Sequence, residues 1–186
     1  MTAPFNLIIA GVGGQGVYGL NRVLWRLCES AGLHCQGSVF KGGAQRQGGI
    51  HAVLRIFQAS QRDYANYSSQ VPPGELDLIL GFEPAETLRY HAFFGSRTKI
   101  VCNTAVIRFV TERRPEFKSV DALQSLQGLG LPLLAKDYSR HQGAKRTNYL
   151  LGRDACAAGY LPFSVDAFDR AFADTFKPTG SRSASS

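Results

Sequence analysis

A glycine-rich segment near the N-terminus has the spacing of an anion-binding loop. Gly11-Val12-Gly13-Gly14-Gln15-Gly16 follows the apolar run 7–10 and precedes residues 17–31, whose apolar side chains recur at helical spacing. Between a strand and a helix, such a loop lets backbone N–H groups and the helix N-terminus face a phosphate, because no side chain blocks the approach. We therefore predict a phosphate-facing or partner-facing loop made of Gly11, Gly13, Gly14, Gln15 and Gly16.

Two other interpretations of this segment stay open. A dinucleotide-binding loop is followed about twenty residues later by an acid that binds the ribose hydroxyl. Here residues 34–40 read His-Cys-Gln-Gly-Ser-Val-Phe and contain no acid, which weakens the case for NAD. The glycines could also serve only a tight strand–helix crossover. A free-standing Rossmann-like nucleotide-binding module and a purely structural interaction subunit are therefore the alternative functions.

A second glycine-rich segment, residues 41–49, carries two cations. It reads Lys-Gly-Gly-Ala-Gln-Arg-Gln-Gly-Gly, and no Asp or Glu occurs between residues 30 and 62. Cations without neighbouring acids favour an anionic partner. We expect Gln45 and Arg46 to contact a substrate and Lys41 to contact a phosphate or a partner; the alternative for Arg46 is a solvated loop arginine.

The chain lacks the patterns of metal and thiamine diphosphate sites. Cys28, Cys35, Cys102 and Cys156 form no Cys-x-x-Cys pair, and the four histidines share no ligand spacing. No Gly-Asp-Gly segment followed by an Asn-Asn pair is present. We therefore expect free thiols, no metal site, and neither an iron–sulfur cluster nor thiamine diphosphate bound by this chain alone.

Length and composition indicate an ordinary globular protein. The chain has 186 residues, 44% hydrophobic and 19% charged, which favours one domain over residues 1–176 followed by a disordered tail at 177–186. Neither a membrane-spanning run nor a secretory signal is recognisable, so we expect a cytoplasmic protein. The formal charge of +7 implies an anionic partner, but the basic stretches lack a nucleic-acid-binding motif.

Strand and helix patterns alternate along the chain. Apolar runs predict strands, and spacings of three and four predict helices. The predicted strands are 7–10, 35–40, 51–57, 76–80 and 99–103, and the predicted helices are 17–31, one opening at Pro84, 145–151 and 164–176. The fold class is therefore α/β, a three-layer sheet domain with helices on both faces.

Two local expectations concern residues 76–94. Glu83 directly precedes Pro84, so we expect it to cap a helix N-terminus or to interact with the helix dipole rather than to act in catalysis. The segment also contains nine large apolar residues. We expect part of that apolar surface to pack on a partner.

Four segments, taken in order, form a pattern beyond that of a generic α/β protein. They are Ile-Ala-Gly-Val-Gly-Gly-Gln-Gly-Val at 9–17, the segment 41–49, residues 71–90 with Gly-Phe-Glu-Pro at 81–84, and Asn-Tyr-Leu-Leu-Gly at 148–152. Together they resemble the gamma-type subunit of the 2-oxoacid:acceptor oxidoreductases, which decarboxylate 2-oxoacids oxidatively to acyl-CoA. Within this family, the small (beta) subunits of indolepyruvate oxidoreductases are the most similar in length and in the Gly-Phe-Glu-Pro segment.

The resemblance implies a division of labour. In this family the thiamine diphosphate and the iron–sulfur clusters belong to a large partner subunit, and an acceptor such as ferredoxin takes the electrons. The small subunit covers the active site and completes the surroundings of the substrate and of coenzyme A. This chain departs from the family pattern Ser-Glu-Val-His-Gly-Met-Ala-Gln-Arg-Gly-Gly, with Val39 for Glu, Lys41 for His, Gly43 for Met and Gln47 for Gly. The resemblance therefore favours an arylpyruvate substrate such as indolepyruvate but leaves the exact 2-oxoacid and the acceptor open.

Overall fold

A computed structural model describes residues 3–41, 49–105, 120–138 and 144–177, and its centre is a six-stranded sheet in the order β2-β3-β1-β4-β5-β6. The strands β1, β4, β5 and β6 run parallel, whereas β3 is antiparallel to both β1 and β2. The strands are β1 (Phe5–Val12), β2 (His34–Lys41), β3 (Gly49–Phe57), β4 (Leu76–Gly81), β5 (Phe94–Asn103) and β6 (Leu133–Lys136). The helices are α1 (Val17–Ser30), α2 (Pro84–Leu88), α3 (Val120–Gly128), α4 (Ala144–Ala157) and α5 (Val165–Phe176).

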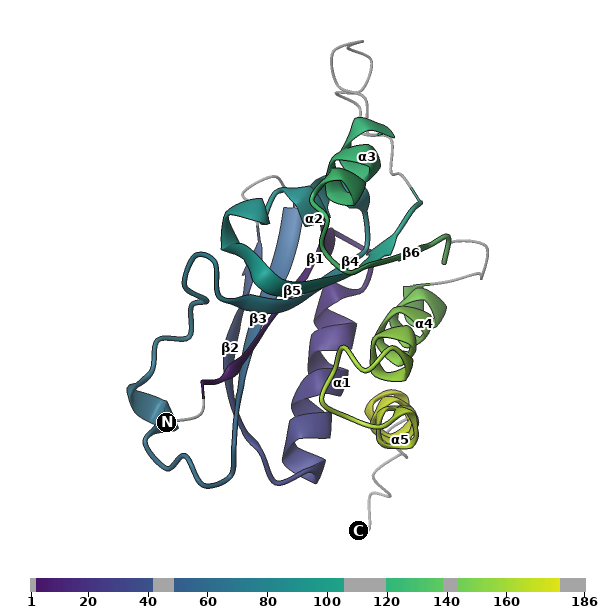
Figure 1. The fold of residues 1–186 in the computed structure, drawn as a ribbon. Helices are drawn as coiled ribbons and strands as arrows, with labels where there is room; N and C mark the ends of the chain where they lie inside the picture. Colours follow the sequence, from purple (N-terminus) through teal and green to yellow (C-terminus); the bar gives the residue numbers. More distant parts are fainter. Residues whose placement is uncertain (1–2, 42–48, 106–119, 139–143, 178–186) are drawn as a thin grey trace.

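The sheet is covered on both faces, which gives three layers (Figure 1). Successive residues of β1 point to opposite faces, so Leu7 and Ile9 join one buried cluster while Ile8 and Ala10 join the other. The first cluster includes side chains of α1, α4 and α5, and the second includes Leu126 of α3 with Leu88 of α2 packed against it. The predicted α/β class with helices on both faces is confirmed.

The structure adds elements that the sequence patterns did not indicate. Helix α3 and strand β6 were not predicted, and β5 begins five residues earlier than the predicted strand at 99–103. Helix α4 extends from Ala144 to Ala157, well beyond the predicted 145–151. Nearly all of the expected disordered tail, from residue 178 onward, lies outside the described residues.

Most of the large apolar residues of the segment 76–94 are buried within this chain, so the part that could pack on a partner is small. Five of its nine large apolar residues are fully buried within this chain, because β4 lies inside the sheet with covered faces on both sides. These residues are Leu76, Leu78, Ile79, Leu80 and Phe82. Only Leu88, Tyr90, Phe93 and Phe94 are half-buried, so they alone remain available to a partner.

A buried arginine ties the long connection between β3 and β4 to the sheet. The Arg55 Nε donates to Asn6 Oδ1 at 2.9 Å, and its Nη1 donates to the carbonyls of Ser68 at 2.6 Å and Gln70 at 3.2 Å. Asn6 in turn donates its amide to the Glu75 carbonyl at 2.8 Å. The guanidinium also lies over the ring of Tyr67, 5.9 Å from its centroid. This network holds the second half of the connection, residues 67–75, against the sheet.

We predict that Arg55→Ala lowers the free energy of unfolding by about 3 kcal/mol, because three carbonyl acceptors lose a charged donor at a buried site. Chemical denaturation followed by circular dichroism measures the change. Arg62→Ala, which removes an exposed cation from the same connection, serves as the matched control and should change stability by less than about 0.5 kcal/mol. Equal stability of the Arg55 variant and wild type would contradict the role of this network.

Candidate functional site

The glycine-rich segment forms the turn between β1 and α1, as predicted. Gly14 has a φ of 93° and Gly16, the N-cap of α1, has a φ of 96°, a region that side chains disfavour. Gly16 provides no side-chain cap, so the first turn of α1 relies on the backbone alone. A Cβ built on Gly14 would meet no heavy atom within 4 Å, so this glycine faces open space.

The side chain of Gln15 is turned into the protein. The backbone N–H of Val12 donates to Gln15 Oε1 at 2.7 Å, and Gln15 Nε2 donates to the carbonyl oxygen of Phe82 at 3.1 Å. A Cβ on Gly11 would lie 2.8 Å from that same Oε1, so Gly11 is required for this close approach. Gln15 therefore links the ends of β1 and β4 and shapes the loop from inside.

The loop is closed on its other side by α4. Asn148 is 2% exposed, and its Nδ2 donates to the Gly16 carbonyl at 3.1 Å, across 132 residues of chain. A Cβ on Gly16 would lie 2.6 Å from the same Nδ2, so a side chain at this position has no room. Two of the four segments behind the family resemblance are thus in direct contact.

A cavity of about 610 Å³ opens beside this loop. It brings Lys41, at the exposed end of β2, together with Gly14 and Gly16, three residues that the sequence analysis had assigned to one site. The remaining wall is mainly apolar and comes from the end of β1, the start of α1 and the strands β2 and β3. The lining residues are Val12, Gly14, Gly16, Val17, Tyr18, Val39, Lys41 and Ile50.

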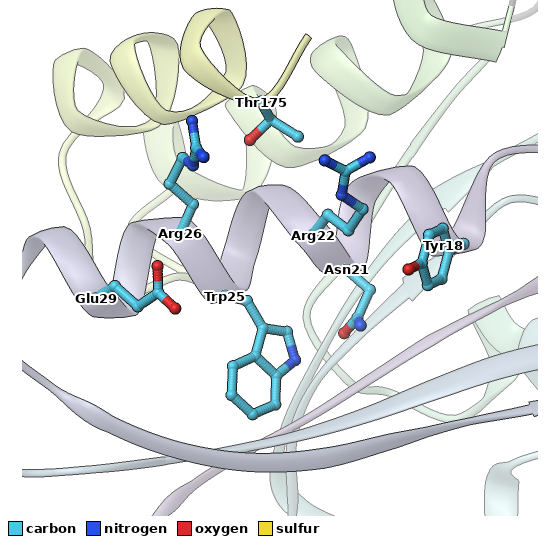
Figure 2. A pocket seen from close by; sticks show the side chains of 7 residues that line it. All are labelled: Tyr18, Asn21, Arg22, Trp25, Arg26, Glu29 and Thr175. Carbon is cyan, nitrogen blue, oxygen red and sulfur yellow. The ribbon is translucent and has the colours of Figure 1, made fainter. Parts of the chain in front are cut away.

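Tyr18 also borders a second pocket of about 340 Å³, which lies along α1 (Figure 2). In this pocket Arg22 and Arg26 project from α1 toward Thr175 of α5, whereas Trp25 points to the opposite side of the helix. The side chain of Tyr18 is 61% exposed. Tyr18 is thus shared by the cavity that contains Lys41 and the pocket that contains the two arginines.

The predicted substrate contacts Gln45 and Arg46 lie outside the described residues. Their segment joins β2, which ends at Lys41, to β3, which begins at Gly49. A Cβ on Gly49 would lie 2.7 Å from Glu86 Oε2, so the Glu86 carboxylate lies at the base of this connection. Glu86 is buried and forms an ion pair with Arg89 at 2.9 Å. The sequence analysis did not single out this acid.

An aromatic cluster adjoins the same end of the hairpin. Phe40 and His51 are opposite each other in the β2–β3 register and stack with centroids 4.8 Å apart, and His51 contacts Tyr90 at 4.8 Å. Burial lowers the pKa of His51 below its ordinary value and raises the pKa of Tyr90 to about 12. Both groups are therefore neutral near pH 7. The alternation of side chains along a strand could have predicted that Phe40 and His51 share one face of the sheet. It could not have predicted that Tyr90, which follows α2, joins them.

Glu83 caps helix α2. Its Oε2 accepts a hydrogen bond from the backbone N–H of Glu86 at 2.8 Å, and its backbone is extended, as a helix N-cap requires. The predicted capping role is confirmed. The side chain is fully buried, so its role is to stabilise the N-terminus of α2.

The four cysteines are free thiols on separate elements, in part on opposite faces of the sheet. Within the described ranges, no group of three or more His, Cys, Asp or Glu side chains could hold a metal ion. None of the helices that the structure describes is long and apolar enough to cross a membrane.

Among curated proteins, the chain is similar to the indolepyruvate oxidoreductase subunit IorB of Archaeoglobus fulgidus. The two are 26% identical over 179 residues, which cover 92% of this chain and 86% of the relative. IorB of Thermococcus kodakarensis is 36% identical over 86 residues, 46% of this chain and 40% of that protein.

Solved structures share the fold. The pyruvate oxidoreductase subunit PORC of Thermotoga maritima has a TM-score of 0.58 at 15% identity, with 94% of this chain and 96% of that chain covered. The gamma subunit of a keto/oxoacid ferredoxin oxidoreductase from Geobacter sulfurreducens gives the same score and identity, with 94% and 87% covered. The match to 2-oxoglutarate:ferredoxin oxidoreductase of Magnetococcus marinus, with a TM-score of 0.50 and 12% identity, covers 94% of this chain but 31% of that one. There the fold is one part of a longer polypeptide.

A family model described as pyruvate ferredoxin/flavodoxin oxidoreductase matches residues 6–184. Because this match spans nearly the whole sequence, the chain belongs to the pyruvate ferredoxin/flavodoxin oxidoreductase family.

Proposed function

We propose that this protein is the small subunit of a cytoplasmic, thiamine-diphosphate-dependent 2-oxoacid oxidoreductase of the indolepyruvate type. The complex decarboxylates an arylpyruvate oxidatively to an acyl-CoA and passes the electrons to an acceptor such as ferredoxin. The observation that carries the proposal is the similarity to IorB over 92% of the chain, and it is supported by the contact of Gly16 with Asn148, which joins two of the segments that resemble the family.

The arrangement of the cysteines supports placing the iron–sulfur clusters in the large partner. Cluster ligands must converge on one site. Cys102 lies in the core cluster on one face of the sheet, whereas Cys28 and Cys156 lie in the cluster on the other face. These thiols cannot reach a common cluster without dismantling the sheet.

We assign the cavity beside the glycine loop to contact with an anionic group at the shared active site. The N-terminus of α1 carries a partial positive charge, and Lys41 adds a full cation to the same cavity. A coenzyme A phosphate or a carboxylate fits this chemistry. In the proposed complex, Gln45 and Arg46 contact the substrate, while the apolar wall of the cavity excludes water around the bound group.

The strand order argues against the alternative of a dinucleotide-binding module. In that module the strand after the first helix pairs directly with the first strand, and an acid at its end binds the ribose. Here the antiparallel strand β3 lies between β2 and β1, and β2 ends at Lys41. A cation, Lys41, thus stands where a dinucleotide-binding module would have its acid, and the strand that carries it occupies a different place in the sheet.

We expect a tagged form of this chain, purified without oxygen from its native cells, to bring down a large polypeptide that contains thiamine diphosphate and iron–sulfur clusters. The complex should reduce an acceptor with indolepyruvate in a reaction that depends on coenzyme A. The same chain purified alone should be colourless and inactive. Stoichiometric iron–sulfur absorption in the isolated chain, or activity with no second polypeptide, would contradict the proposal.

In the assembled complex, Arg46→Ala should lower kcat/KM by roughly ten- to a hundredfold, because a charge-assisted contact of about 1.5–3 kcal/mol is lost. Lys41→Ala should cause a smaller loss that shrinks as salt rises, since an exposed ammonium acts as a screened point charge. Steady-state kinetics at two ionic strengths measures both effects. Arg62→Ala, an exposed cation outside the cavity, is the control. Wild-type kinetics from a correctly assembled Arg46 variant would assign the segment 41–49 to structure and favour the purely structural subunit.

A further inference from the structure

The outward side of α1 carries large and charged side chains that this chain leaves uncovered. Tyr18, Arg22 and Arg26 are exposed on successive turns of the helix, and the half-buried Trp25 lies on its flank. All four line the pocket of about 340 Å³ along α1, and Thr175 of α5 contributes to its wall (Figure 2). Tyr18 is the most exposed large hydrophobic side chain that the structure describes. We call these four α1 residues the α1 face.

The two arginines of the α1 face have no salt-bridge partner in the part of the chain that the structure describes. Asp174 of α5 interacts with the charge of Arg26, but its carboxylate is paired with Lys177, which is the main cause of the lowered pKa of Asp174. Glu29 is the one acid among the described residues that line the pocket, and no salt bridge there joins it to either arginine. The pocket therefore carries an excess of positive charge.

The same pocket contains an unsatisfied polar group. Asn21, which is 6% exposed, lines the pocket, and its buried Oδ1 has no hydrogen-bond partner within the described part of the chain. Thr175 differs, because its hydroxyl donates to the carbonyl of Ala171 at 2.7 Å. A buried acceptor without a donor is destabilising and is rare in folded proteins. The unpaired amide oxygen thus favours a pocket that a group from outside completes.

The composition of the α1 face is that of a protein interface rather than of a small-molecule site. Tyr, Trp and Arg are enriched in protein interfaces and among the residues that dominate binding energy there. A small ligand is usually enclosed over most of its surface, whereas Tyr18 and both arginines are exposed. Tyr18 also lines the cavity beside the glycine loop. The α1 face is therefore continuous with the side of the molecule that the proposed function assigns to the shared active site.

We propose that the α1 face is a docking surface for an acidic segment of the large partner subunit. This inference rests on the proposed function, which supplies that partner. Arg22 and Arg26 lie one helical turn apart, a spacing that acids three or four residues apart on a partner helix can match. Each guanidinium binds one carboxylate through two parallel N–H donors. Apolar side chains of the same segment cover the exposed ring of Tyr18.

The test compares tagged full-length chains, each expressed in the native cells and purified without oxygen. Wild type should bring down the large subunit that contains thiamine diphosphate and iron–sulfur clusters. Arg22→Glu/Arg26→Glu should recover at most about a tenth of that amount, because two attractive contacts become repulsive. Arg62→Glu, the same charge reversal at an exposed position outside the pocket, should recover as much as wild type. Thermal unfolding followed by circular dichroism should be the same for all three chains, since the substituted arginines are exposed.

The outcomes separate this inference from the proposed function. Equal recovery of the large subunit by wild type and by the double variant overturns the docking surface and leaves the proposed function intact. If wild type itself recovers no such subunit, both proposals fail. Normal assembly of the double variant together with a raised KM for coenzyme A assigns the two arginines to a phosphate of that ligand, which also overturns the docking surface.

A photoreactive phenylalanine analogue in place of Tyr18 identifies the partner segment directly. In the assembled complex it should cross-link to a segment of the large subunit that contains acids three or four residues apart. The same analogue in place of Arg62 should not cross-link to that segment. Arg22→Lys/Arg26→Lys, which keeps the charges but loses the paired donors, should recover an intermediate amount that falls as salt rises. A Tyr18 cross-link confined to a second copy of this chain overturns the proposal.

Discussion

The carbonyl oxygen of Phe82 organises the edge of the sheet where the candidate site lies. It accepts hydrogen bonds from Gln15 Nε2 at 3.1 Å and from Asn103 Nδ2 at 3.3 Å, while the Phe82 N–H donates to Ala10 at 2.8 Å. One residue after β4 therefore holds the carboxyl ends of β1, β4 and β5 together. Each bond contributes about 1 kcal/mol net, but an unpaired buried amide costs about 1–3 kcal/mol, so the loss of one partner destabilises the whole arrangement. Because Gln15 must reach both Val12 and Phe82, these hydrogen bonds determine the shape of the glycine loop.

Close contacts with neighbouring side chains explain most of the glycine pattern without reference to a ligand. Gly11 makes room for the Gln15 amide, Gly16 makes room for Asn148, and a Cβ on Gly81 would collide with the Thr87 hydroxyl. Gly14 is different, because no heavy atom lies within 4 Å of its absent side chain and its positive φ alone explains the residue. Packing thus accounts for the closed side of the loop. The open side, shared by Gly14 and Lys41, is where a ligand can approach.

The sequence predicted the elements whose pattern is strong and local. The continuous apolar runs of β1 and β4 are buried on both faces, and the helical spacing of α1 gives seven buried residues. Helix α3 has few such positions, with Ala122 and Leu126 buried, and the four residues of β6 are too short for any periodic pattern. The proximity of Lys41 to the glycine loop was predicted from its charge alone. The inward turn of Gln15 and the contact of Asn148 with Gly16 depend on partners 67 and 132 residues away, which no local pattern can indicate.

Helix α1 and strand β2 form two walls of the cavity beside the glycine loop. Val17 and Tyr18 lie at the start of the helix, and Val39 and Lys41 lie at the end of the strand. In the sheet, β2 is an edge strand that pairs with β3 alone, so its other support comes from side chains that pack between the sheet and α1. The width of the cavity therefore depends on side-chain packing between α1 and β2 rather than on backbone pairing between them.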